Sequence, residues 1–385
     1  MSPEAGGPTE AVRSLIEYAP PGYSSEVVTL DDPEADFLKG YPFPVHALGP
    51  IRSVYGYSAR VLPWLRANGG RFDGVIVNGL WQYCGYAVWR AFGGRKPYVV
   101  FAHGMLDPYF KRRFPLKHAK KWVYWVGAEY WVLRGARRVL FTTAAEERLA
   151  EESFSLRRWN GMVVPFGATG PEGDAERQRE AFYAECPELR GRRFLLYLGR
   201  IHRKKGCDML IDAFVQVAGG DPELDLLMAG PDPQRWGSEL QAVVARAGLT
   251  GRVHWPGMLG GDVKWGAFFA SEAFALPSHQ ENFGMAVAEA LACGRPVLLA
   301  DKVNIAEEIA ADGAGLVEPD TTEGTRRLLE RWIAIGAEER KEMGRRALAC
   351  FERRYDMRRN TERIVGLFDL HGARTEPLVE RRSEG

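Results

Sequence analysis

Two glutamates stand eight positions apart around a run of small residues, Glu281 and Glu289 in the segment 277–297. Asn282 is a good N-cap residue, which predicts a helix whose first turn is 283–286. The first turn of a helix has free backbone N–H groups and a partial positive charge, so it suits an anion. At 1.5 Å per residue, Asn282 and Glu289 lie about 10 Å apart along the axis, roughly the length of a diphosphate with a hydroxyl-bearing group at each end. The alternative is a capped surface helix with two solvated carboxylates.

A basic loop earlier in the chain favours the anion site. Arg200 and Lys205 are five positions apart in YLGRIHRKKG (197–206), after an apolar run and before a helical pattern. On a strand-to-helix loop these two cations can converge on one anion. A solvated basic loop is the usual interpretation of such a cluster. Because two anion sites here fall on one sheet edge, we prefer the binding interpretation.

Short apolar runs alternate with amphipathic ones along the chain, which places these loops in an α/β fold. The expected strands of a first series are 74–78, 97–102, 137–142 and 161–166. Those of a second series are 193–199, 224–230, 252–257, 273–278, 296–301 and 315–319. Such alternation calls for parallel sheets covered on both faces, and ligands bind these sheets at the carboxyl ends of the strands. We therefore predict two Rossmann-like doubly wound domains that face each other across a cleft.

Composition agrees with two domains, since single cores stop growing near ~250–300 residues and the chain has 385. The 51 basic and 50 acidic residues give a net charge of +1, so no overall field selects nucleic acid or a membrane. The five cysteines are scattered without CxxC spacing, so we expect reduced thiols, with neither a disulfide framework nor a metal site. No apolar run approaches the ~18 residues of a membrane span, and the amino terminus lacks a signal-peptide pattern. We expect a cytoplasmic protein.

Several motifs resemble those of retaining glycosyltransferase family 4, which has the GT-B fold. The segment from Glu281 to Glu289 in ENFGMAVAEALACGRPV, preceded by LPS, is similar to the family's donor motif. Gly199-Arg200 with Lys205-Gly206 is similar to its diphosphate clamp. Other similar segments extend the resemblance over nearly the whole chain: AGGPTEAVRSL (5–15), FAHGMLDP (101–108), MAGPD (228–232), VHWPG (253–257) and GAGLVEPD (313–320). The form of FAHGMLDP resembles bacterial surface-polysaccharide transferases.

The resemblance implies roles for the charged residues. Glu281 would bind hydroxyls of the transferred sugar, and Glu289 would bind the ribose of a nucleotide-sugar donor. Arg200 and Lys205 would neutralise the leaving diphosphate in place of a metal ion, so no metal and no cofactor are expected. His103 would lie near the reacting face of the sugar, although a lone histidine after a strand is more often structural.

The resemblance also implies a donor site with close backbone approach. Phe283, Gly284 and Met285 would offer backbone N–H groups near the sugar and the phosphates. The remaining expected donor-binding residues are Gly7, Gly199, Gly230 and Asn282.

The implied activity is transfer of a hexosyl or N-acetylhexosaminyl group, with retention, from a nucleotide sugar to a glycan or lipid-linked acceptor. Retention in this family is thought to proceed by front-face displacement, so no protein nucleophile is assigned. One alternative is a nucleotide-sugar epimerase of the same fold, although no carboxylate pair in the first domain is placed to remove and return a ring proton. Another is a truncated, non-catalytic binding partner. The sequence does not select the sugar, the base or the acceptor.

The expected domain boundaries combine composition with the resemblance. The first, acceptor-side domain is expected at 1–168, a glycine- and charge-rich linker at 169–191, and the nucleotide-sugar domain at 192–355. A carboxy-terminal helix at 356–374 has an amphipathic pattern, and the resemblance implies that it packs back on the first domain. A tail is expected at 375–385.

The amino terminus departs from the family pattern. The glycine-rich loop of the family follows the first strand of the first domain, whereas here Gly6 and Gly7 follow only MSPEA. A strand needs ~5–6 residues, typically apolar, so the opening strand is expected to be missing. Either the assigned start is too late or this copy is truncated. Of the two, we expect that the natural gene begins upstream with such a strand.

One basic segment, 109–125, combines cations with aromatic residues. It contains no acid, and its cations are Lys111, Arg112, Arg113, Lys117, Lys120 and Lys121. A peripheral contact with an anionic bilayer at the inner face of the cell membrane, or with a lipid-diphosphate acceptor, is one interpretation. A solvated basic face with its aromatic residues in the core is the other. Both interpretations stay open from the sequence.

Overall fold

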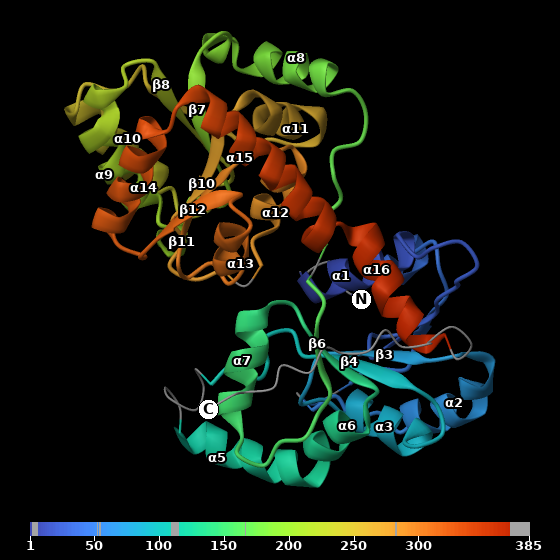
Figure 1. Cartoon of the computed structure of the whole chain (residues 1–385). Coiled ribbons are helices and arrows are strands. Elements are labelled where there is room, and N and C mark those ends of the chain that lie inside the picture. Colours follow the sequence, from blue (N-terminus) through green and yellow to red (C-terminus); the bar gives the residue numbers. More distant parts are fainter. Residues whose placement is uncertain are drawn as a thin grey trace. The chain divides into compact units, whose positions relative to one another are not determined.

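The computed structural model describes residues 1, 7–51, 53, 55–108, 115–165, 167–281 and 283–369. The chain divides into two compact units (Figure 1). The first unit comprises Met1–Phe141, Leu149–Val164 and the described residues from Thr361 onward. The second unit comprises Thr142–Arg148 and Pro165–Asn360.

The first unit is built on a parallel sheet in the order β3-β4-β5-β6. Its strands are β3 (Val75–Asn78), β4 (Tyr98–Phe101), β5 (Arg138–Phe141) and β6 (Gly161–Val163). A separate parallel pair joins β1 (Val27–Thr29) to β2 (Val45–Ala47). Along β4, Tyr98 and Val100 belong to one buried cluster and Val99 and Phe101 to another, because successive side chains point to opposite faces of a sheet. Both faces of this sheet are therefore covered.

Helices cover the two faces of this sheet differently. The helices of the first unit are α1 (Gly7–Glu17), α2 (Val61–Asn68), α3 (Tyr83–Phe92), α5 (Pro115–Tyr124) and α6 (Tyr130–Gly135), with a π-helical turn η4 (Trp125–Glu129) between the last two. Residues of α2, α3 and α6 join the cluster of Tyr98. The opposite cluster receives Ile364 from α16 (Met357–Val365) and Phe368 from the 3-10 turn η9 (Gly366–Phe368). Figure 1 shows α16 on the side of this sheet away from α3 and α6.

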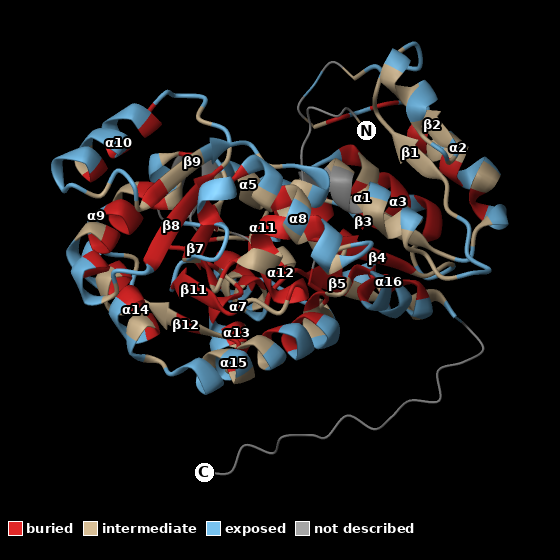
Figure 2. Ribbon diagram, turned by 90° about the horizontal axis from the view of Figure 1, so that it is seen from above, coloured by how far each residue is buried: buried red, intermediate tan, exposed pale blue. Residues whose placement is uncertain are grey.

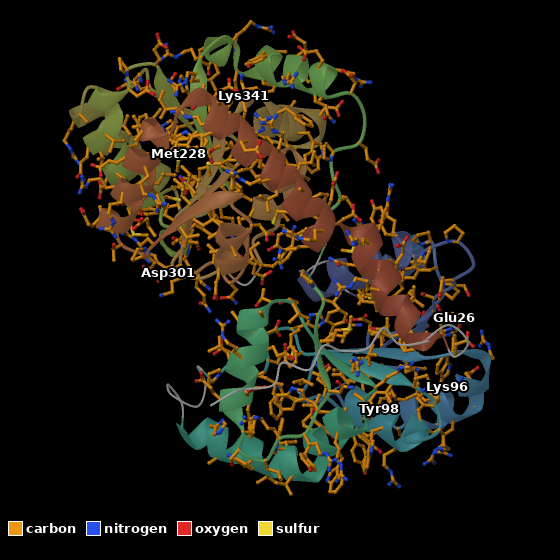
Figure 3. The ribbon with its side chains drawn as sticks, in the orientation of Figure 1. Glu26, Lys96, Tyr98, Met228, Asp301 and Lys341 are labelled. Carbon is orange, nitrogen blue, oxygen red and sulfur yellow. The ribbon has the colours of Figure 1, made fainter. Side chains whose placement is uncertain are left out.

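The second unit has a six-stranded parallel sheet in the order β12-β11-β10-β7-β8-β9. Its strands are β7 (Arg193–Leu198), β8 (Leu224–Ala229), β9 (Val253–Gly257), β10 (Ala273–Leu276), β11 (Val297–Ala300) and β12 (Gly315–Glu318). The strand order reverses between β7 and β10, as in the doubly wound dinucleotide-binding fold. Figure 2 shows β7, β8 and β11 as buried strands, and Met228 of β8 lies among the packed side chains in Figure 3.

Helices lie on both sides of this sheet. They are α8 (Ala175–Glu185), α9 (Cys207–Val217), α10 (Gly237–Arg246), α11 (Gly261–Ala270), α12 (Met285–Ala292), α13 (Ala306–Ala311), α14 (Thr322–Ala334) and α15 (Ala337–Cys350), with a π-helical turn η8 (Phe351–Tyr355) after α15. Helix α7 (Ala144–Ser153) joins residues of both units. Figure 1 shows α9, α10 and α14 on one side of the sheet and α8, α11 and α12 on the other.

The structure confirms the predicted α/β class with parallel sheets, since every expected strand of both series is present within a few residues. The range 169–191, assigned to a linker from composition, contains α8, which packs against α11. The predicted absence of an opening strand concerns MSPEA, of which residues 2–5 lie outside the described residues. No helix in the described part of the chain is both long and apolar enough to cross a bilayer.

Candidate functional site

The switch in strand order of the second unit brings the two predicted anion loops together. The loop 199–206 follows β7, and the loop 277–284 follows β10, its neighbour in the sheet. Loops after two parallel strands leave the same edge, and a ligand crevice opens where their connections run in opposite directions. The topology therefore confirms that the two loops share a sheet edge, and their role as anion sites stays a prediction.

Hydrogen bonds tie these two loops to each other. The Ser278 hydroxyl and the His279 backbone N–H each donate to the carbonyl of Lys204 at 3.0 Å. Gly206 has a φ of 68°, and a Cβ there would overlap the carbonyl of Pro277. Only glycine allows this close approach at a left-handed φ. The fold thus fixes Lys205, one residue before Gly206, against the loop that carries Glu281.

Lys205 and Glu281 form an ion pair across this junction. Both side chains are about four-fifths covered, with exposed fractions of 19% and 18%. Glu281 is also held by its backbone, whose N–H donates to Lys302 at 3.1 Å and whose carbonyl accepts from Asn304 at 3.0 Å. The predicted sugar-binding carboxylate and the predicted diphosphate-binding cation are therefore direct neighbours in this structure.

Arg200 is exposed at the same edge. Its backbone carbonyl accepts a hydrogen bond of 2.6 Å from the buried Tyr197 hydroxyl, which anchors the loop while the side chain faces solvent. The adjacent turn is tight, since Gly230 has a φ of 140° and a Cβ there would overlap the carbonyl of Gly199. These two glycines bring the loops after β7 and β8 into backbone contact, and their predicted role in donor binding stays a prediction.

The helix after β10 begins later than the sequence predicted. Helix α12 starts at Met285, and Gly284, with a φ of 74°, occupies the N-cap position, so the predicted first turn of 283–286 is wrong. The physical reason is Gly284, whose left-handed φ ends the loop in place of a helical turn. Phe283 is buried and packs edge-on against Tyr355 at 5.7 Å, while Met285 is exposed. Asn282, the predicted N-cap, lies outside the described residues.

Glu289 lies in α12 and has a partner that the sequence analysis missed. Lys264 of α11 donates to a Glu289 carboxylate oxygen at 2.8 Å, and its ammonium group lies 4.2 Å from the centre of the Trp265 ring. The pair is about as covered as Lys205 and Glu281, with exposed fractions of 22% and 17%. Both predicted glutamates are thus charge-paired, each to a lysine from another element.

His103 lies in the first unit, directly after β4. Its Nε2 lies 3.1 Å from the side-chain oxygen of Asn78 at the end of β3, and its ring stacks on Phe101 at 5.2 Å. Burial lowers the pKa of His103 to about 4, so the imidazole is neutral near pH 7. Its φ of 50° is unusual for a residue other than glycine. Gly7, the other predicted residue of this unit, begins α1.

The comparisons with known proteins match both units. Residues 6–167 match the glycosyl transferase 4-like domain, and residues 179–349 match the glycosyl transferases group 1. The chain belongs to these glycosyltransferase families. The predicted family resemblance is thereby confirmed.

The curated relatives that this chain matches are named as sugar transferases. The chain is 28% identical over 203 residues to the lipopolysaccharide core biosynthesis mannosyltransferase LpsB of Rhizobium meliloti (strain 1021), covering 48% of this chain and 57% of that protein. It is 25% identical over 249 residues to the alpha-D-kanosaminyltransferase of Streptomyces kanamyceticus, covering 63% and 62%. The chain therefore spans about three-fifths of the length of these two relatives.

Solved structures share the fold over nearly the full length. Anabaena Alr3699/HepE in complex with UDP has a TM-score of 0.72 at 18% identity and covers 95% of this chain and 97% of that chain. The glycosyltransferase WaaG, described as involved in lipopolysaccharide biosynthesis, has a TM-score of 0.63 at 18% identity and covers 94% and 96%. These neighbours confirm the predicted GT-B fold of the chain.

Two charged residues near the predicted sites were not found from the sequence. Lys264 sits in an aromatic and apolar helix pattern with no motif around it, and Glu129 lies in the aromatic-rich stretch before β5. Only the fold shows that Lys264 reaches Glu289 and that Glu129 reaches the loop after β3. A single acid inside a long run of aromatic residues is the one signal that could have drawn attention to Glu129.

Proposed function

We propose that this glycosyltransferase moves a hexosyl group from a nucleotide sugar to a glycan or lipid-linked acceptor in bacterial polysaccharide synthesis. The transfer retains the anomeric configuration and needs no metal ion. Among the relatives is a lipopolysaccharide core mannosyltransferase, and UDP is bound in a structure of the same fold, which supports a nucleotide-sugar donor.

The observation that carries this proposal is the junction of the two loops at the switch point of the second unit. There Lys205 is paired with Glu281, and Arg200 is exposed on the same loop as Lys205. At a leaving diphosphate, these two cations would supply the electrostatic stabilisation that a metal ion supplies in other transferases. A diphosphate that binds Lys205 would release the Glu281 carboxylate toward the hydroxyls of the sugar.

The roles of the other residues follow from their chemistry. Glu289 accepts from the ribose hydroxyls, and the backbone around Phe283, Gly284 and Met285 donates to the donor's phosphates and sugar. In the first unit, the neutral imidazole of His103 accepts or donates a hydrogen bond at the reacting sugar without adding a charge. No side chain is assigned as a nucleophile.

Calorimetry with UDP and GDP, with and without a chelator, tests the donor site. We expect binding that is unchanged by chelation, and a loss of about tenfold or more in affinity for Lys205→Ala, as for removal of a charge-assisted contact to phosphate. Lys204→Ala is the matched control, since Lys204 is the adjacent exposed lysine and contributes only its backbone to the loop contact. Loss of binding with chelator, or equal losses for both lysines, would contradict the proposal.

Turnover separates the two glutamates. Glu281→Gln should lower the rate of sugar transfer or donor hydrolysis about 100-fold while the affinity for free UDP or GDP changes little. Glu289→Gln should weaken the binding of the free nucleotide itself. An epimerase would instead interconvert the donor sugar without an acceptor, and a non-catalytic binding protein would bind the donor and leave it intact.

We also propose that the surface of α5, η4 and α6 contacts an anionic bilayer. Four large apolar side chains are exposed there, namely Val123, Tyr124, Val126 and Trp131, with exposed fractions of 75%, 40%, 52% and 40%. Lys120 and Arg134 are exposed on the same elements, and the only acid of 118–135 is the buried Glu129. Exposed aromatic and aliphatic residues beside cations suit the interface of a bilayer.

The alternative interpretation of 109–125 fits part of the segment. Trp125 is buried, and Trp122 packs against the core of the first unit, as a solvated basic face with aromatic residues in the core would require. Lys111, Arg112 and Arg113 lie outside the described residues.

Vesicle cosedimentation tests the bilayer contact. We expect binding to vesicles of phosphatidylcholine with phosphatidylglycerol, weaker binding to phosphatidylcholine alone, and loss of binding for Val123→Ser with Val126→Ser. Leu348→Ser, which changes an exposed apolar residue of the second unit, is the control. Equal binding of both variants, or binding only to vesicles that carry a lipid diphosphate, would contradict a general bilayer contact.

A further inference from the structure

Glu129 is a buried acid of the first unit to which the proposed function assigns no role. It is the last residue of the π-helical turn η4 and is 2% exposed. Burial raises the pKa of Glu129 to about 7, while the Trp81 backbone N–H and the Lys121 ammonium act in the opposite direction. Burying a carboxyl group is costly unless it has partners, and π-helical turns recur at functional sites. Its partners are therefore informative.

The first partner is the turn that follows β3. A Glu129 carboxylate oxygen accepts a 2.8 Å hydrogen bond from the backbone N–H of Trp81. Trp81 has a φ of 68°, a left-handed conformation that is an outlier for a bulky residue. Such a conformation persists only where its surroundings hold it. The carboxyl group of Glu129 is one such restraint.

The turn of Trp81 in turn holds the segment after β4. The Trp81 indole N–H donates to the carbonyl of Met105 at 3.2 Å, and the Leu80 backbone N–H contacts the Met105 sulfur at 3.1 Å. His103 lies two residues before Met105 in this segment, and it also has a positive φ. Trp81 and His103, which both have a positive φ, lie on neighbouring loops, and the indole of Trp81 connects these loops.

From this chain of contacts we propose that Glu129 is a positioning residue for His103, acting through the turn of Trp81 and the backbone of Met105. The proposal rests on the proposed function, in which His103 meets the reacting sugar. Glu129 itself does not touch the substrate. Its carboxyl group keeps the loops after β3 and β4 in one conformation, so that the imidazole is presented in one place.

The groups that face Glu129 determine whether Glu129 holds the loops more firmly or less firmly as the pH rises. Lys121 of α5 lies 4.4 Å from the centre of the Trp81 ring, and its charge favours the carboxylate form of Glu129. Burial is the main cause that raises the pKa of Tyr55, and the nearby charge of Glu129 raises it further. A carboxylate accepts the Trp81 N–H more strongly than the neutral acid does. The loops should therefore be held more firmly as the pH rises through 7.

Steady-state kinetics of three variants test the proposal on the full chain. Glu129→Ala should lower kcat for sugar transfer about 30- to 100-fold, as for a misplaced catalytic group, with the dissociation constant for UDP or GDP within about twofold of the wild type. Glu129→Gln keeps an acceptor for the Trp81 N–H and should restore kcat to within about threefold. Wild-type kcat should rise between pH 6 and 8 where that of Glu129→Gln stays flat.

Glu26→Gln is the matched control. Glu26 is a partly buried carboxylate of the first unit, held by His46 at 2.7 Å and Arg71 at 2.5 Å (Figure 3). This variant should keep the wild-type kcat and its pH profile. If Glu129→Ala keeps the wild-type kcat, or if Glu129→Gln loses as much as Glu129→Ala, the positioning role is overturned.

Amide hydrogen exchange gives a reading that does not depend on activity. Exchange of 103–106 should be about tenfold faster in Glu129→Ala than in the wild type, and unchanged in Glu129→Gln. If Glu129→Ala does not fold, the deciding measurement is the exchange of 103–106 in Glu129→Gln and in the wild type, each at pH 6 and at pH 8. If the exchange pattern is as expected but no sugar transfer is found, only the proposed function is refuted. If exchange of 103–106 is the same in Glu129→Ala as in the wild type, the role of Glu129 is refuted.

Discussion

Asp225 of the second unit and Glu129 of the first unit are both buried carboxyl groups, and their surroundings differ. Asp225 accepts hydrogen bonds from Arg192 at 2.5 and 2.7 Å and from Arg252 at 2.9 Å, and its second oxygen lies 3.1 Å from His254. Against the effect of burial, these partners lower the pKa of Asp225 to about 2. Burial instead dominates at Glu129 and raises its pKa to about 7.

The positions of the two acids explain this difference. Asp225 is the second residue of β8, at the amino end of the strand, whereas Glu129 contacts the turn at the carboxyl end of β3. Ligands of parallel sheets bind at the carboxyl edge, so full charge compensation at the amino edge serves stability. An incompletely compensated acid at the carboxyl edge is a candidate for function.

The largest effect that this comparison predicts is on the stability of the second unit. Asp225→Asn leaves two arginines near a neutral amide, and loss of one partner of a buried ion pair costs about 3 kcal/mol or more. Arg192 is 39% exposed, which keeps the expected cost at the low end. Urea denaturation followed by circular dichroism measures the change.

An exposed pair supplies the control for Asp225→Asn. Glu180 binds Arg190 through two hydrogen bonds of 2.8 Å, but both side chains are about half exposed. Glu180→Gln should leave the urea midpoint unchanged, because solvent screens such pairs. Equal destabilisation by the two variants would mean that burial does not distinguish them.

A smaller effect concerns the pH dependence of stability of the first unit. The pKa of Glu129 is higher in the folded protein, about 7, than the ordinary 4.5, so the folded state binds this proton more tightly. Its contribution to stability is full below pH 4.5 and is lost as the pH rises through 7, by up to about 3 kcal/mol. The wild type should therefore lose free energy of unfolding relative to Glu129→Gln between pH 5 and pH 8.

Urea denaturation of both proteins at these two pH values measures this change. Because other groups titrate equally in both proteins, the difference between them isolates Glu129. If the free energies of unfolding of the two proteins differ by the same amount at both pH values, ionisation of the buried Glu129 costs no stability. Glu129 would then resemble Asp225.

The sequence predicted strands such as β7 and β8 well because their side chains are buried and form continuous apolar runs, as in LLYL before Gly199. The short, only partly buried strands β1 and β2 were not predicted. It also predicted that Lys205 and Glu281 share a sheet edge, since both follow strands. It misplaced the start of α12, because the left-handed φ of Gly284 depends on the surrounding loop and not on local propensity. Composition likewise concealed α8, a charged helix whose stability comes from packing on α11.

The partners of the acids could not be predicted at all. Lys264 and Glu289 are 25 positions apart, and Glu129 and Trp81 are 48 apart, so no local pattern connects either pair. Hydrophobic periodicity locates elements, but the side chains that meet between elements depend on packing angles and register. This is why the sequence pointed to Glu281 and Glu289 as candidate residues but did not point to Lys264, the lysine beside Glu289.

The smallest predicted effect concerns Glu289, whose charge compensation lies between that of Asp225 and that of Glu129. It is partly covered and has one cationic partner, Lys264 at 2.8 Å. Lys264→Met keeps most of the length of the side chain and removes the charge, so the Glu289 carboxylate loses the group that orients it on α12. We expect UDP or GDP to bind about three- to fivefold more weakly, with at most about 1 kcal/mol lost in stability.

Lys341→Met is the control, since Lys341 pairs with Glu338 at the same 2.8 Å but is exposed on α15 (Figure 3). Titration calorimetry distinguishes the outcomes: tighter binding in Lys264→Met would mean that the lysine competes with the ribose for Glu289, and the carboxylate would then need no partner to be oriented.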